Sequence, residues 1–260
     1  MAFADLGAVR LFYTDDGSGD PAVVFVHGFS CDSHDWSWQL PHFQQRHRVV
    51  AVDLRGHGRS SAPDSGYGAV ELAGDVAGLL RQLAVGPVVA VGRSLGGSVV
   101  SALAIEHADL VRGLVCVDPA YLIPDEMGAY TGELLEAVRS SDPVPVVQQI
   151  FRAMESPGLP AALHSWHLRR AAGTPDHVLQ QALESQLGNM TLYSQSVDYL
   201  SRRSCPVLAF YADPARAPLE RPLLEDPRSR LVTWEGAGHW LHQERPAEFN
   251  GLVDTWLASL

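Results

Sequence analysis

Short runs of β-branched residues alternate with helical patterns along most of this 260-residue chain, and no other feature constrains its fold as strongly. Strands are predicted at residues 9–13, 22–26, 49–52, 87–91, 114–117, 206–211 and 231–234. Two of them, 22–26 and 49–52, are nearly continuous apolar runs, which is typical of strands buried on both faces. Helical spacing follows at residues 37–45, 68–84, 95–107 and 246–260. This alternation predicts an α/β fold, in which helices cover both faces of a mostly parallel sheet.

One stretch of about 80 residues, from 121 to 203, breaks the alternation. It contains no convincing strand, and its helical patterns fall at residues 132–138, 144–154, 159–172 and 177–187. A segment of this length is too long for a loop. We therefore predict a core domain made of residues 1–120 and 204–260, and a helical cap subdomain, residues 121–203, inserted after the strand that ends near Val117.

The segment Gly92-Arg93-Ser94-Leu95-Gly96-Gly97 directly follows a buried strand and directly precedes a helix. This is the pattern G-x-S-x-G in the strand–turn–helix context that it requires. A serine at so sharp a turn has a strained backbone, and Gly92 and Gly96 leave room for it. The start of the helix offers a free N–H at Leu95 and the positive end of the helix dipole. We predict that Ser94 is a nucleophile and that Leu95 stabilises an oxyanion.

Two further positions complete this chemistry. His239, in Gly236-Ala237-Gly238-His239-Trp240, follows the last predicted strand, and the small residues before it leave its ring free to reach Ser94. We predict that His239 is the general base. The backbone N–H of Phe29, in the loop after an earlier strand, is the predicted second oxyanion donor, and His27 beside it is interpreted as a residue that fixes this loop.

These segments together resemble the α/β-hydrolase superfamily over essentially the whole chain. The matching residues are His27-Gly28-Phe29, Asp53-Leu54-Arg55-Gly56-His57-Gly58-Arg59-Ser60, Gly92-Arg93-Ser94-Leu95-Gly96-Gly97 and Gly238-His239. The resemblance implies that the segment from Asp53 to Ser60 is a structural turn and that the helical insertion is a cap. It also implies the chain order serine, acid, histidine for a catalytic triad.

The acid of such a triad has two candidates, Asp118 and Asp213. The family usually keeps it after the last strand but one, in a pattern like G-x-x-D, but ungapped comparison brings Ala215 to that position and leaves Asp213 two residues early. Some members carry the acid after the preceding strand, where this chain has Asp118. Pro119 is expected to hold Asp118 in an extended conformation and to aim its carboxylate off the end of the strand. We favour Asp118 and keep Asp213 as the alternative.

These residues predict a serine hydrolase that cleaves a carboxylic ester or lactone through an acyl-enzyme intermediate. Within the family, a serine rather than an aspartate at the turn disfavours haloalkane dehalogenase and epoxide hydrolase chemistry. Relatives with the same serine turn cleave carbon–carbon bonds, form peracids as perhydrolases or haloperoxidases, or act as lyases. The same scaffold also serves as a ligand receptor with little turnover. All of these alternatives stay open at this point.

The substrate is expected to be a largely apolar small molecule, because the predicted cap is rich in aromatic and methionine side chains. These are Met127, Tyr130, Phe151, Met154, Trp166, Met190, Tyr193 and Tyr199. Trp240 and Phe29 are predicted to line the substrate cleft. Arg93 has no apolar role at the turn, and two interpretations are open for it: binding of a substrate carboxylate, or pairing with a nearby acidic side chain.

Composition excludes several classes of function. All 19 basic residues are arginine, which excludes a Schiff-base lysine, a pyridoxal-phosphate enzyme and a Walker-A phosphate loop. The net charge of −11, without a basic run longer than two residues, argues against binding to nucleic acid or to anionic membranes. No apolar run approaches the roughly 18 residues of a membrane span.

The remaining expectations concern location and cofactors. The N-terminus shows no secretory signal, and Cys31, Cys116 and Cys205 are interpreted as reduced thiols of a cytoplasmic protein. His164 and His167 lie three residues apart on a predicted helix, but no nearby cysteine or carboxylate in the sequence completes a ligand set. We expect no metal, no organic cofactor, and a small-molecule substrate as the partner. Assembly into a homo-oligomer is left open.

Overall fold

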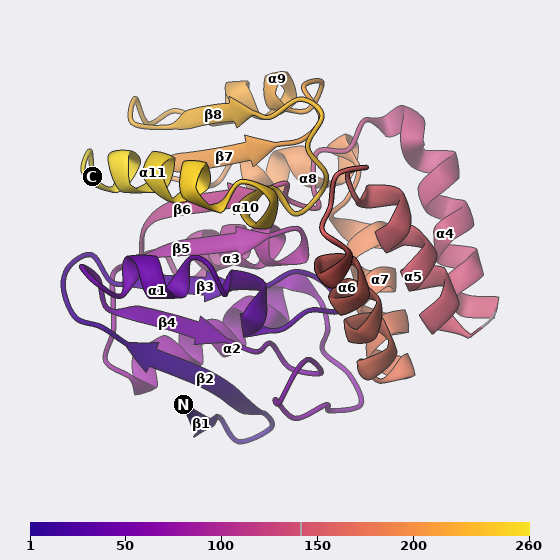
Figure 1. Cartoon of the computed structure of the whole chain (residues 1–260), viewed down its shortest axis with the longest axis horizontal. Helices are drawn as coiled ribbons and strands as arrows, with labels where there is room; N and C mark the ends of the chain where they lie inside the picture. The colour runs from indigo at the N-terminus through magenta and orange to yellow at the C-terminus, as the bar shows by residue number, and fades with distance from the viewer. Residues whose placement is uncertain (141) are drawn as a thin grey trace.

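The computed structural model, which describes residues 1–140 and 142–260, has an eight-stranded sheet at its centre (Figure 1). The strands are β1 (Ala2–Asp5), β2 (Arg10–Asp16), β3 (Val23–Val26), β4 (Val49–Val52), β5 (Val88–Arg93), β6 (Val111–Val117), β7 (Val207–Tyr211) and β8 (Arg230–Thr233). Their order is β1-β2-β4-β3-β5-β6-β7-β8. β1 and β2 pair antiparallel at one edge, and the strands from β4 to β8 are parallel. The predicted α/β fold is confirmed.

Helices cover both faces of the sheet, which is why every residue of β3 and β4 is buried. In the view of Figure 1, α1, α10 and α11 lie in front of the sheet, and α2 and α3 lie behind it. Their bounds are α1 (Leu40–Phe43), α2 (Ala69–Gln82), α3 (Leu95–Glu106), α9 (Ala217–Glu220), α10 (Leu241–Glu244) and α11 (Pro246–Leu257). Short 3₁₀ turns are η1 (Ser33–Trp36), η2 (Ala108–Leu110), η3 (Asp125–Met127) and η4 (Arg221–Leu223).

Two elements near the N-terminus differ from the sequence prediction. The helix expected over residues 37–45 is replaced by η1 and the four-residue α1. Pro41 explains this difference. It is accommodated in the first turn of α1, but in the interior of a longer helix it would break the hydrogen-bond pattern. Strand β1 was not predicted, because it has only four residues and three of them are alanine or aspartate, which are not favoured in strands.

Four helices lie beyond the carboxyl ends of the parallel strands (Figure 1). They are α4 (Gly128–Ser140), α5 (Pro143–Met154), α6 (Ala161–Gly173) and α7 (Asp176–Asn189), and we call them the helical layer. A fifth helix, α8 (Tyr193–Leu200), was not predicted. Its Tyr199 hydroxyl donates to Glu106 of α3 at 3.1 Å, which ties α8 to a helix that packs on the sheet. The division into core and cap subdomain stays a prediction. In the part of the chain that the structure describes, no helix combines the length and apolarity needed to cross a bilayer.

Candidate active site

Ser94 lies between the end of β5 and the start of α3, with φ 54° and ψ −119°. This left-handed backbone is rare for a residue other than glycine and is found where the surrounding structure enforces it. A Cβ atom on Gly96 would collide with the carbonyl oxygens of Val26 and His27, and one on Gly92 would collide with the carbonyl of Gly96. Both glycines are therefore required by the close approach of the backbone around Ser94.

We expect Gly96→Ala to lower the free energy of unfolding by about 2–3 kcal/mol, because backbone atoms cannot move aside as a flexible side chain can. Gly132→Ala is the matched control. Its Cβ would meet no atom within 4 Å, and on helix α4 it should stabilise by about 0.5–1 kcal/mol. Urea unfolding of the two variants measures both effects. Equal stability of the two variants would contradict the steric argument.

His239 reaches the site on the turn before α10. Its Nδ1 lies 2.6 Å from Oδ2 of Asp118, and it lines the same cavity as Ser94. Its backbone N–H donates to the carbonyl of Met154 at 2.9 Å, and the N–H of Gly238 donates to Glu244 at 3.0 Å. Burial lowers the pKa of His239 below its usual 6.5, although Asp118 acts in the opposite direction. The ring is thus held in place and favoured in its neutral form.

Asp118 follows β6 and adopts φ 39°, which corrects the expected extended conformation. The chain after it turns back over the serine turn, where the N–H of Ala120 donates to the carbonyl of Ser94 at 3.1 Å. An extended Asp118 would carry the chain away from this contact, and aspartate tolerates the left-handed region better than most residues. Burial tends to raise the pKa of Asp118, but the hydrogen bond from His239 and the charge of Arg216 hold it below its usual value.

Asp213 occupies a different place. Its side chain accepts a hydrogen bond from the N–H of Ala215 at 2.9 Å and is exposed on the loop after β7. Of the two acids that the sequence left open, the structure brings Asp118 to His239.

The predicted oxyanion donors, Phe29 and Leu95, line the cavity beside Ser94. Within residues 1–140 and 142–260, neither backbone N–H donates to a protein acceptor. His27 supports the loop that carries Phe29: it accepts from the N–H of Leu54 at 2.9 Å, and its Nδ1 lies 2.7 Å from the carbonyl of Gly28. The interpretation of His27 as a residue that fixes the loop agrees with these contacts.

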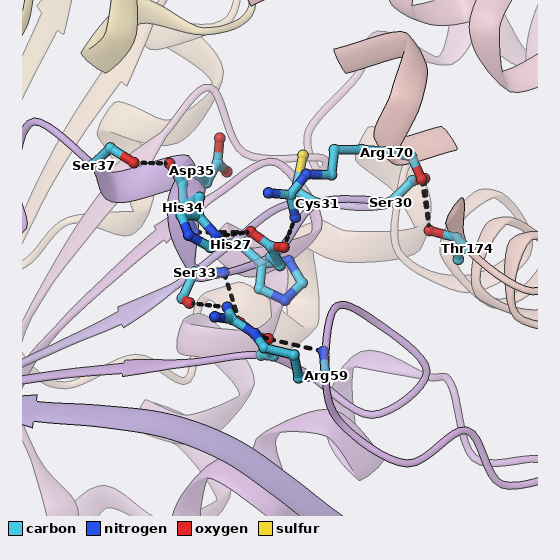
Figure 2. A network of polar contacts seen from close by, with 12 residues as sticks. His27, Ser30, Cys31, Ser33, His34, Asp35, Ser37, Arg59, Arg170 and Thr174 are labelled. Atoms are coloured by element: carbon cyan, nitrogen blue, oxygen red, sulfur yellow. Dashed lines mark hydrogen bonds and ion pairs between the residues drawn. The ribbon is translucent and has the colours of Figure 1, made fainter. Parts of the chain in front are cut away.

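The same loop is held from two further sides (Figure 2). On the side of the sheet, Asp53 accepts from the N–H of Ser33 at 2.8 Å and pairs with Arg59 at 2.7 Å, as a structural turn would. On the side of the helical layer, Figure 2 shows Ser30 hydrogen-bonded to Thr174 at the end of α6, at 3.1 Å. The position of Phe29 therefore depends on both the sheet and the layer.

The cavity around Ser94 has a volume of about 280 Å³ and a mainly apolar lining contributed by the sheet ends and the helical layer. Its lining includes Leu95, Ile123, Leu134, Ile150, Phe151, Met154, Leu183 and Leu187. Of the aromatic and methionine residues predicted for the cap, Phe151 and Met154 line this cavity; Met154 is also exposed, as are Met127 and Tyr130.

Comparison with known proteins identifies the family of this chain. The family model described as the alpha/beta hydrolase family matches residues 23–252. The chain belongs to this family. A mouse (Mus musculus) sn-1-specific diacylglycerol lipase, ABHD11, is 28% identical over 98% of this chain and 87% of its own length. Epoxide hydrolase A of Mycobacterium tuberculosis is 26% identical over 98% of this chain and 96% of its own.

A solved structure of a thermophilic esterase from Thermogutta terrifontis superimposes with a TM-score of 0.82, at 25% identity, over 98% of this chain and 96% of the other. Further similar proteins carry the names of a haloperoxidase and an enol-lactonase. The chain is therefore an alpha/beta hydrolase, and the reaction that it catalyses has to be inferred from the site.

Arg93 of this alpha/beta hydrolase is buried, and its charge is already paired. Its Nε donates to Asp35 at 2.9 Å, and its Nη2 lies 2.9 Å from Sγ of Cys31. Of the two interpretations left open for Arg93, the structure shows the pair with an acidic side chain; Arg93 also borders the cavity, and its contact with a substrate stays a prediction. A buried guanidinium that gave up Asp35 would be left uncompensated, which is strongly unfavourable.

We expect Asp35→Asn to lower the free energy of unfolding by about 3–5 kcal/mol, because it leaves Arg93 buried without a counter-charge. Asp20→Asn is the control: Asp20 pairs with Arg112 at 2.8 Å, but its side chain is 82% exposed, so its loss should cost less than about 1 kcal/mol. Denaturant midpoints with an unchanged slope would measure both. A small effect of Asp35→Asn would mean that Arg93 is not held by this pair.

Trp240 was predicted to line the cleft, and this prediction is corrected. The side chain is fully buried, and the described residues that line the cavity do not include it. Its indole stacks on the ring of His167 from α6, with centroids 3.9 Å apart and an interplanar angle of 15°. This stack buries more aromatic surface than an exposed position at the cavity would.

Glu155 is a partner that the sequence reading overlooked. Its two carboxylate oxygens accept from His164 and from His167, at 2.5 Å and 2.8 Å. Among the described residues, no group of three histidine, cysteine or acidic side chains is arranged to hold a metal ion. Arg216, which follows β7 and contacts Asp118, was also not predicted. The sequence feature that could have indicated it is a single arginine in a loop rich in alanine and proline.

Proposed function

We propose that this alpha/beta hydrolase is a serine enzyme that cleaves a carboxylic ester or lactone through an acyl-enzyme intermediate. One observation carries the proposal: Ser94, on its strained turn, shares an apolar cavity with His239, whose Nδ1 lies 2.6 Å from Asp118. A serine, a neutral imidazole and a buried carboxylate in this order are the groups that acyl transfer requires.

In the proposed mechanism, Ser94 attacks the carbonyl carbon while His239 takes its proton. The backbone N–H groups of Phe29 and Leu95 stabilise the developing oxyanion, each by roughly 3 kcal/mol. His239 returns the proton to the leaving alcohol, and an acyl-enzyme remains. His239 then activates water, which releases the acid and restores Ser94. Asp118 holds the tautomer of His239 and stabilises the imidazolium.

The cavity supports a neutral, largely apolar acyl group. Both arginines that border it, Arg93 and Arg216, are paired with carboxylates, at 2.9 Å and 3.0 Å. A substrate carboxylate would have to compete with these buried ion pairs. We therefore propose that the helical layer serves as a cap over an apolar acyl group.

A burst experiment tests the proposal. With p-nitrophenyl butyrate in excess, we expect one equivalent of p-nitrophenol per chain before the steady state, and a butyryl adduct on Ser94 by mass spectrometry. The wild-type chain binding the ester without turnover would support a ligand receptor instead. Turnover without an adduct would favour another chemistry on the same serine turn.

The pH dependence of kcat/KM follows from the lowered pKa of His239. The base must be neutral, so the rate falls as the pH falls through this pKa. Because burial lowers the pKa of His239 below 6.5, we expect the midpoint of this fall, measured with a neutral ester, to lie below pH 6.5. A profile over about pH 4.5 to 8 measures the midpoint. A midpoint above 6.5 would contradict the neutral resting imidazole.

A further inference from the structure

Arg216 contacts Asp118 through the carboxylate oxygen that His239 does not use. Its Nη1 donates to Oδ1 of Asp118 at 3.0 Å, while Oδ2 lies 2.6 Å from His239. The Nη2 of Arg216 donates to the carbonyl of Tyr121 at 2.7 Å and also to that of Pro119. The guanidinium thus binds both the carboxylate and the turn that follows it.

The fold explains how this contact arises. β6 and β7 are adjacent and parallel, with Val117 opposite Phe210, so the residues after the two strands meet at the same edge. The loop after β7 returns at Arg216, whose N–H donates to the carbonyl of Asp213 at 3.2 Å. The guanidinium lies 4.9 Å from the ring centroid of Tyr211, and the residue is 6% exposed. Arg216 is therefore held from several sides, and its planar head fits several acceptors at once.

The charges around His239 give this contact an electrostatic role. Asp118, Arg216 and Arg93 face the ring from the ends of three strands, and Glu244 lies on the adjoining α10. Burial is the largest cause of the lowered pKa of His239; the charge of Arg93, which is paired with Asp35, acts in the same direction, and that of Arg216 adds to it. When His239 is neutral, the buried charge of Asp118 is balanced by Arg216. When His239 gains a proton, the imidazolium and Arg216 carry the same charge on either side of Asp118, so Arg216 disfavours the protonated ring.

We propose that Arg216 is a positioning residue, which fixes Asp118 in its left-handed conformation and balances the negative charge of its carboxylate. The inference rests on the proposed function, because it takes Asp118 as the acid of the triad. The effect of Arg216 on His239 is proposed to pass through its contact with Asp118.

The ring of His239 provides a test that needs no substrate. We expect Arg216→Met to raise the pKa of His239 in an NMR titration of ¹⁵N-labelled histidine, because a positive charge that opposes the imidazolium is removed. The signal is assigned with His239→Gln. Arg221→Met removes an exposed positive charge five residues further along and should leave this pKa unchanged. Arg216→Lys keeps the charge and should also leave it close to the wild-type value. An unchanged pKa in Arg216→Met would overturn the electrostatic part of the proposal.

A double-mutant cycle tests whether Arg216 acts through Asp118. Arg216→Met should lower kcat about 10- to 100-fold per titrated active site, with KM changed less than about threefold. Arg216→Lys should lose part of kcat despite its normal pKa, because an ammonium does not match three acceptors in one plane. In an Asp118→Asn background, Arg216→Met should change kcat by less than about threefold. Additive losses would show that Arg216 supports the site without acting through Asp118.

These readouts separate the two proposals. If no ester is turned over but the pKa of His239 rises in Arg216→Met, the ester hydrolase assignment fails and the positioning role stands. If esters are turned over but the pKa stays constant and the losses add, the positioning role fails alone.

Discussion

Ser94→Ala is expected to lower kcat for ester hydrolysis by about 10⁵- to 10⁶-fold, since no acyl-enzyme can form without the hydroxyl. The oxyanion donors and the cavity remain, so a residual rate over water should persist. Steady-state kinetics with p-nitrophenyl butyrate measures the loss, and the burst should disappear.

Ser98→Ala is the matched control for this variant. Ser98 lies one turn further along α3, and its hydroxyl is buried without a hydrogen-bond partner among the described residues. Its removal should leave kcat within about twofold, because no hydrogen bond is lost. If Ser94→Ala kept more than about one hundredth of the wild-type kcat, Ser94 would not be the nucleophile.

Asp118→Asn should lower kcat by about 10⁴-fold, because an amide favours the wrong tautomer of His239 and cannot stabilise the imidazolium. The comparison is with Asp213→Asn, which should stay within about twofold, since the exposed carboxylate of Asp213 accepts from the N–H of Ala215 in its own loop. Rates must be expressed per active site, because Asp118→Asn also leaves Arg216 without its carboxylate. If Asp213→Asn lowered kcat more than Asp118→Asn did, Asp213 would be the acid of the triad.

Much of the fold follows from local patterns in the sequence. The parallel strands are apolar runs that need no distant information, and the serine turn is specified by six consecutive residues, 92–97. Strand β1 escapes this reading because three of its four residues are alanine or aspartate, which are not favoured in strands. Helix α8 escapes because it is short and buries only Ser196 and Leu200.

The polar partners of the site could not be read in the same way. Arg93 and Asp35 are 58 residues apart, and Arg216 and Asp118 are 98 apart, so no spacing rule connects them. Asp118 and Asp213 both follow strands that end at one edge of the sheet, and only the backbone and side-chain conformations decide which of them meets His239. Trp240 shows the same limit: its position in sequence beside His239 gave no sign that α6 would supply His167 as a stacking partner.

The hydrogen bonds from His239 to Met154 and from Ser30 to Thr174 limit how much of this protein could be removed by engineering. The first joins the turn of His239 to the end of α5, and the second joins the loop of Phe29 to the end of α6. A truncated variant that closed residues 120 and 204 directly together would delete both anchors, as well as ten of the residues that line the cavity beside Ser94. A variant built on the sheet alone would therefore need new contacts at both points to hold His239 and Phe29 in place.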